Sequence, residues 1–164
     1  MKRKLVLVVH NVRSALNVGA LFRTADGAGV DRIILTGYTP VPPKGNTLYP
    51  TKAEKELVKT ALGAEKSILW EKSVSLSKVL VRLRQEKFEI VALEQSKKSI
   101  DYQKYIPKKH IALVIGNEVR GVDIKILKQC DIVIEIPMRG KKNSLNVSVA
   151  TGIALYQIMS TIEV

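Results

Sequence analysis

Short apolar segments that alternate with helical patterns constrain the fold of this chain most. Aliphatic and β-branched residues dominate the segments 4–9, 31–37, 88–94, 110–116 and 132–137. Between them apolar residues recur at helical spacing, as at Val18, Leu21, Phe22 and Ala25. Most of the strands are apolar on both faces, which is typical of strands buried between two layers of helices. The sequence therefore predicts an α/β fold with a parallel sheet flanked by helices.

The length and the cysteine count limit the class of protein. A chain of 164 residues is long enough for one domain with a continuous core, which we expect to span residues 1–164. No apolar run approaches the ~20 residues of a membrane span, so we expect no membrane association. A lone cysteine, Cys130, excludes an internal disulfide and a Cys-based metal site, and it fits a cytoplasmic location.

The charge points to a polyanionic partner. Twenty-seven Lys and Arg residues against fifteen Asp and Glu residues give a net charge of +12, and nucleic acid is the first candidate partner for such a chain. Aromatic residues make up only 5%, so phosphate contacts are expected to dominate over base stacking. The alternative is a basic surface that serves solubility alone.

Three polar loops follow apolar strands, after residues 9, 115 and 136. Because the carboxyl ends of parallel strands meet at one edge of a sheet, these loops are expected to converge there. Glu118 is the only carboxylate in them, whereas asparagines are frequent. The cations of the loops would suit an anionic polymer: Arg13, Arg120, Arg139, Lys141 and Lys142. No Ser–His–Asp set, metal-ligand spacing or Walker glycine loop is present, so we expect no metal and little covalent chemistry by the protein itself.

The segment 132–157 combines a strand, a basic loop and a helix that begins near Asn146. Ser144 and Asn146 can both cap this helix. Asn143, Ser144 and Asn146 are either ligand-facing groups or parts of an ordinary turn. A second loop, 38–50, contains four prolines and is either a flap that contacts substrate or a rigid surface connection.

Three of these segments resemble the motifs of the SpoU/TrmH type of the SPOUT superfamily, which are S-adenosylmethionine-dependent RNA 2′-O-ribose methyltransferases. They read NVGALFRTADGAGV (17–30), IGNEVRG (115–121) and IPMRGKKNSLNVSVATGIAL (136–155). The resemblance implies a C-terminal deep trefoil knot, roughly over residues 88–164, and a homodimer with its active site near the subunit interface. It also implies that S-adenosylmethionine binds at Leu93, Gly116, Asn117, Ile136, Met138, Ser144 and Leu145.

The same resemblance implies that Arg23 is catalytic, with Asn17, Glu118, Ser144 and Asn146 as its companions. Arg23 would act either as the general base or as a stabiliser of developing alkoxide charge. A guanidinium stays protonated in proteins, which favours the second role. Glu118 would orient Arg23 or Asn146, or it would serve as the N-terminal charge of a helix near residue 122.

The function that the sequence predicts is methyl transfer to a ribose 2′-hydroxyl of tRNA or rRNA. The core begins within a few residues of Met1, so substrate selection is expected to rest on the core and its basic surface. Two alternatives stay open: a catalytically silent RNA-binding or assembly protein with the same fold, and a knotted methyltransferase that acts on a base.

Overall fold

The computed structural model describes residues 3–45 and 47–160, which form one α/β unit. Seven strands make a single sheet in the order β3-β2-β1-β6-β4-β7-β5, and neighbouring strands are parallel throughout. The predicted parallel sheet flanked by helices is confirmed. The strands are β1 Lys4–His10, β2 Arg32–Thr36, β3 Leu69–Ser73, β4 Glu89–Leu93, β5 Ile100–Asp101, β6 His110–Ile115 and β7 Ile132–Glu135.

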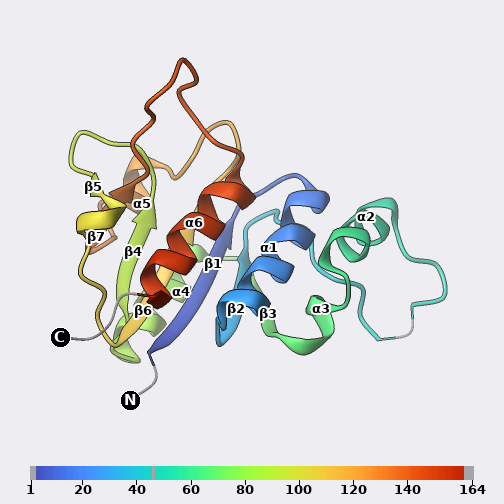
Figure 1. Cartoon of the computed structure of the whole chain (residues 1–164). Coiled ribbons are helices and arrows are strands. Elements are labelled where there is room, and N and C mark those ends of the chain that lie inside the picture. Colours follow the sequence, from blue (N-terminus) through green and yellow to red (C-terminus); the bar gives the residue numbers. More distant parts are fainter. Residues whose placement is uncertain (1–2, 46, 161–164) are drawn as a thin grey trace.

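Helices cover both faces of the sheet (Figure 1). They are α1 Ala15–Ala28, α2 Lys52–Ala61, α3 Ala64–Ser67, α4 Leu76–Gln85, α5 Ile124–Leu127 and α6 Val147–Ser160, with a 3-10 turn η1 at Tyr102–Lys104. Helices α1, α2 and α6 pack on one face, and α4 packs on the other.

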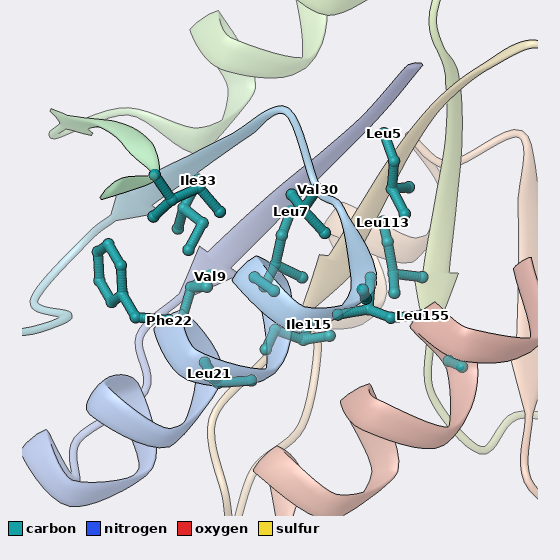
Figure 2. Packing of buried hydrophobic residues seen from close by; sticks show 14 of the residues in the cluster. Leu5, Leu7, Val9, Leu21, Phe22, Val30, Ile33, Leu113, Ile115 and Leu155 are labelled. Atoms are coloured by element: carbon teal, nitrogen blue, oxygen red, sulfur yellow. The ribbon is translucent and has the colours of Figure 1, made fainter. Parts of the chain in front are cut away.

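The alternation of side chains along β1 explains why both faces are buried. Leu7 and Val9 point to the α1 and α6 side, where they pack with Leu21 and Leu155 (Figure 2). Val8 points to the opposite side and packs in the second core cluster, with α4. Successive residues of a strand face opposite sides, so a strand with helices on both sides must be apolar throughout.

Helix α1 begins two residues earlier than its apolar spacing suggested. Ser14 is its N-cap, and the Ser14 hydroxyl accepts a hydrogen bond from the Asn17 backbone N–H at 3.2 Å. Gly29 ends the helix in the left-handed conformation (φ 74°), which glycine adopts without steric cost. The cap therefore places Asn17 in the first turn, at the edge of the sheet where β1 ends.

The two ends of the described chain are tied together below the sheet. The Arg3 guanidinium donates to the Ile158 carbonyl at 2.5 Å, near the C-terminus of α6, and to the Lys108 carbonyl at 3.1 Å. Close by, the buried Tyr105 hydroxyl donates to the Glu89 carboxylate at 2.6 Å. This cluster lies at the amino ends of the strands, so the opposite edge is left for the polar loops.

Candidate active site

A cavity of about 340 Å³ lies at the carboxyl edge of the sheet, between the loops that follow β4, β6 and β7 and the first turn of α6. The structure brings together at this cavity every residue expected to bind the cofactor. Leu93, Gly116, Asn117, Ile136, Met138, Ser144 and Leu145 all line it.

The loop after β6 is closed by its own hydrogen bonds. Asn117 and Gly121 exchange backbone hydrogen bonds of 3.1 and 2.9 Å, and the Asn117 side-chain oxygen accepts from the Val119 and Arg120 N–H groups, both at 2.9 Å. Gly116 is required by close approach, since a Cβ there would lie 2.3 Å from the Gly121 carbonyl oxygen. The loop is thus a compact wall of the cavity.

Glu94 and Gln95 line the cavity too, and the sequence analysis missed them. The Glu94 carboxylate accepts from the Val122 N–H at 2.8 Å and so fastens the loop after β6 to the end of β4. The Gln95 side-chain amide donates to the Asn143 carbonyl at 2.8 Å and so reaches the loop after β7. The signal was present, because both residues directly follow an apolar strand at the same edge, but only three such loops were considered.

Glu118 connects the loops after β1 and β6. Its carboxylate accepts from the Arg13 N–H at 3.0 Å, from the Ser14 N–H at 2.9 Å and from the Asn17 side-chain amide at 3.1 Å. The Asn17 side-chain oxygen accepts in turn from the Asn146 amide at 3.2 Å. Three of the five residues predicted to be catalytic therefore form one hydrogen-bonded chain across three loops.

None of the predicted roles of Glu118 matches these contacts fully. Among the described residues it bonds directly to neither Arg23 nor Asn146, and it reaches Asn146 only through Asn17. The N-cap of α5 is Asp123, whose carboxylate accepts from the Lys125 N–H, so Glu118 is not the charge that caps that helix. Glu118 instead binds the two N–H groups that precede α1.

The hydrogen bonds to Glu118 keep it ionised. Partial burial raises the pKa of this carboxyl, but the N–H groups of Arg13 and Ser14 and the amide of Asn17 outweigh that effect, and the net shift is downward. Glu118 is therefore a permanent acceptor near neutral pH. A carboxylate with a lowered pKa is also a weak proton acceptor, which favours a positioning role for it over base catalysis.

The capping of α6 falls to one of the two residues that were predicted for it. The Asn146 side-chain oxygen accepts from the Ser148 N–H at 2.8 Å. Ser144 makes no such bond within the described chain; it is exposed and lines the cavity. The structure thus separates a capping asparagine from a serine whose hydroxyl is available to a ligand.

The lining of the cavity is negatively charged, although the chain as a whole is basic. Glu94, Glu118 and Glu135 line it, and no Lys, Arg or His does so among the described residues. None of the three forms an ion pair with a described residue, and Glu135 accepts instead from the Ser99 hydroxyl at 2.6 Å. Carboxylates that neutral donors satisfy keep their charge, so the cavity favours a cationic ligand.

Arg23 lies apart from this cavity. Six residues of α-helix span about 1.7 turns, which turns Arg23 about 120° around α1 from Asn17. Its exposed side chain lines a separate hollow with Lys59 and Thr60 of α2 and Tyr156 of α6. Within one chain, the structure does not bring Arg23 together with the other four residues predicted to be catalytic.

Comparison with known proteins decides the family. The sequence profile of the SpoU rRNA methylase family matches residues 4–156. The chain belongs to the SpoU rRNA methylase family. The predicted resemblance is thereby confirmed, and the matched range includes the whole cavity and the chain from Asn17 through Glu118 to Asn146.

Curated members of the SpoU family resemble the chain over nearly all of its length. The tRNA (guanosine(18)-2′-O)-methyltransferase of Aquifex aeolicus is 32% identical over 158 residues, covering 95% of this chain and 69% of that protein. Two relatives from Staphylococcus are longer, and the chain spans only 59% and 57% of their lengths.

Solved structures of SpoU proteins share the fold. The A. aeolicus TrmH/SpoU tRNA modifying enzyme superposes with a TM-score of 0.80 at 32% identity, over 96% of this chain and 75% of that one. The AdoMet-bound rRNA methyltransferase from Sinorhizobium meliloti superposes with a TM-score of 0.81 at 26% identity, over 96% of this chain and 56% of that one.

The cations predicted to bind RNA surround the cavity without lining it. Arg13, Arg120, Arg139, Lys141 and Lys142 are all exposed, and none of them forms an ion pair with a described residue. They belong to the loops after β1, β6 and β7. This member of the SpoU family thus has an acidic cavity inside a basic rim.

Two searches of the described residues complete the site. No group of three or more His, Cys, Asp or Glu side chains in segments 3–45 and 47–160 is arranged to hold a metal ion. No helix in that part of the chain has the length and apolar character needed to cross a membrane.

Proposed function

We propose that the chain is an S-adenosylmethionine-dependent RNA methyltransferase that transfers a methyl group to a ribose 2′-hydroxyl of tRNA or rRNA. One observation carries the proposal in addition to the family. The residues expected to hold the cofactor line a single cavity, and Glu118 lines the same cavity while it joins Asn17 to Asn146. Cofactor and catalytic candidates of the family therefore meet at one place.

The residues of the cavity fit S-adenosylmethionine. Its sulfonium and ammonium groups are cationic, and the cavity is lined by carboxylates with no cation among its described lining residues. Compact walls at Gly116 and Asn117 leave room for a ligand close to the backbone. When bound, the cofactor supplies an electrophilic methyl group, so the protein has to align a ribose hydroxyl and ease the loss of its proton.

The side chains around the cavity divide this work. Asn17 and Asn146 are fixed by Glu118 and hold the first turn of α1 against that of α6, which sets the entrance to the cavity. The Ser144 hydroxyl, exposed at the lining, can bond to cofactor or ribose. The Arg23 guanidinium remains charged and would stabilise the developing alkoxide or bind the adjacent phosphate.

We further propose a homodimer in which Arg23 acts at the cavity of the partner subunit. Arg23 is exposed and lies in a hollow that is separate from the cavity of its own chain. The same side of the molecule exposes apolar side chains of two helices that pack together, with Leu16 43%, Val149 51% and Tyr156 55% exposed. A second copy packed on α1 and α6 would cover these residues and bring Arg23 to another site.

The C-terminal knot, roughly over residues 88–164, and the cytoplasmic location stay predictions. In support of the knot, the last strands are not neighbours in sequence order, since β4 lies between β6 and β7. Residues 161–164 of the predicted range lie outside the described part of the chain. Resistance of the C-terminal half to mechanical untying and the fractionation of cells are the respective tests.

RNA is the proposed substrate because of the rim and the family. Exposed Arg13, Arg120, Arg139, Lys141 and Lys142 surround an acidic cavity, which places phosphate-binding groups outside the cofactor site. The named relatives modify tRNA or rRNA. Since the chain spans little more than half of several relatives, which RNA it selects is part of the proposal.

Methyl transfer by the purified chain tests the proposal. The protein is incubated with methyl-labelled S-adenosylmethionine and with tRNA or rRNA that lacks the modification, and the RNA is digested to nucleosides. Label in a 2′-O-methyl nucleoside supports the proposal. Label on a base would favour the base-modifying alternative, and RNA binding without transfer would favour the silent RNA-binding protein.

A further inference from the structure

Tyr38 is an exposed aromatic residue that is fixed to the wall of the cavity. It directly follows the turn after β2, at the same edge of the sheet as the catalytic candidates. Its backbone N–H donates to the Asn11 side-chain oxygen at 3.1 Å, and its hydroxyl accepts from the Asn117 side-chain amide at 3.2 Å. Nevertheless 57% of the residue is exposed. Both ends of the side chain are held, and its surface is left to solvent.

The backbone around Tyr38 takes up unusual conformations to hold it there. Asn11 has a positive φ of 56° and Gly37 one of 63°. A Cβ at Gly37 would lie 1.8 Å from the Asn11 side-chain oxygen, so only glycine leaves room for the acceptor of the Tyr38 N–H. The Asn11 amide is fixed in addition by the His10 ring at 3.0 Å. Such backbone arrangements persist where the surrounding contacts determine them.

The other exposed tyrosines differ from Tyr38. Tyr49, further along the same loop, is 90% exposed and makes no side-chain hydrogen bond to a described residue. Tyr156 lines the separate hollow beside Arg23. Among the described aromatic residues, Tyr38 alone bonds to a loop that lines the cavity. Its neighbour Asn117 precedes Glu118, so the ring borders the catalytic candidates.

We propose that the Tyr38 ring is a stacking platform for an unpaired base of the RNA substrate, next to the ribose that is methylated. This rests on the proposed function and specifies how the substrate is positioned. Phosphate contacts of the basic rim attract RNA but do not place one nucleotide, whereas a base stacked on a fixed ring holds its ribose in register. A ring that is already immobile loses little conformational entropy on binding. Stacking tolerates any base, and it selects unpaired segments over duplex RNA.

Two substitutions separate stacking from a structural role. Tyr38→Ala removes the ring, and Tyr38→Phe keeps the ring but removes the hydroxyl that bonds Asn117. Tyr49→Ala is the matched control, because it removes an exposed tyrosine of the same loop that has no bond. The probe is a single-stranded RNA oligonucleotide carrying 2-aminopurine, whose fluorescence is quenched on stacking, and bulk tRNA serves for affinity.

We expect the wild type, Tyr38→Phe and Tyr49→Ala to quench the single-stranded probe, and Tyr38→Ala to leave it bright. Affinity for bulk tRNA should fall about 5- to 150-fold in Tyr38→Ala, with an unchanged salt dependence because no charge is lost. Cofactor affinity, measured by calorimetry, should be the same in all four proteins. A 2-aminopurine duplex should not be quenched by any of them.

Quenching by Tyr38→Ala as strong as that by the wild type would overturn the proposal. So would a Tyr38→Phe protein as weak as Tyr38→Ala, since the hydroxyl bond and not the ring would then matter. If Tyr38→Ala does not fold, the comparison of Tyr38→Phe with the wild type still decides between these readings. Because quenching needs no methyl transfer, a failure of the proposed activity would appear separately, as absent transfer in the wild type.

Discussion

Glu118 holds the first turn of α1 by three donors, and this contact sets the geometry of the site at the scale of single residues. Glu118→Ala should free Asn17 and lower the rate of methyl transfer at least about tenfold, because an aligned hydroxyl would lose its frame. Glu118→Gln should recover only part of the rate, since its NH₂ group would face an N–H of Arg13 or Ser14. Single-turnover kinetics measure both effects, and a wild-type rate in Glu118→Ala would contradict the positioning role.

His10 makes the anchor of Tyr38 sensitive to pH. Burial lowers the pKa of His10 below its ordinary value of 6.5; Asp123 opposes the shift and Lys72 adds to it. The neutral ring accepts from the Asn11 amide and donates to the Thr36 hydroxyl, a tautomer inferred from these partners. Because the folded chain disfavours the proton, the stability due to His10 is present above about pH 6.5 and is lost below it.

Urea unfolding tests this pH dependence. Between about pH 7.5 and about pH 5 the unfolding midpoint of the wild type should fall further than that of His10→Gln, which cannot be protonated there. The carboxylates titrate alike in both proteins, so their contribution cancels in the comparison. Equal decreases in the two midpoints would show that His10 does not carry the effect.

At the scale of elements, the contact between α1 and α2 depends on Gly19. A Cβ at this position would lie 2.1 Å from the Leu57 carbonyl oxygen and 2.1 Å from the Thr60 hydroxyl. Gly19→Ala would force the two helices apart and should reduce the free energy of unfolding by about 1–3 kcal/mol, despite the better helix propensity of alanine. Gly140→Ala is the control, because its Cβ would enter open space. Thermal unfolding midpoints that match in the two variants would refute the close contact.

The elements themselves were largely predictable from the sequence, and the site only in part. Strands such as β1 were found because both of their faces are buried, which leaves a continuous apolar run. The cavity residues followed from the resemblance and from the rule that loops after parallel strands meet. Glu94 was missed because its carboxylate serves the loop after β6, 28 residues further along the chain. No pattern within β4 indicates such a partner.

Arg23 shows where spacing along one helix was insufficient. Its place in a family motif beside Asn17 suggested a shared site, yet 120° of helical rotation directs it to another face. Tyr38 could not be recognised either, because its anchors come from Asn11 and Asn117, which are 27 and 79 residues away. Contacts of that kind depend on how the loops are placed, and composition does not report them.

At the scale of the whole molecule, the proposed dimer predicts complementation between two inactive variants. Arg23→Ala alone should lower the rate of transfer roughly 100-fold or more with little loss of cofactor affinity, since Arg23 does not line the cavity. Lys59→Ala, in the same hollow, should cost much less. Mixing Arg23→Ala with Glu118→Ala should restore activity, because mixed dimers regain one intact site. A monomer in light scattering that retains transfer would contradict the shared site.

The central claim is that this SpoU family chain methylates a ribose hydroxyl of cellular RNA. It is tested most directly by mapping 2′-O-methylation at nucleotide resolution in total tRNA and rRNA, from cells with the chain, without it, and with only its Arg23→Ala form. The account predicts a ribose methylation that disappears without the chain, returns with the wild type and fails to return with Arg23→Ala. Identical methylation maps in all three kinds of cell, or a lost methyl group that proves to lie on a base, would contradict it.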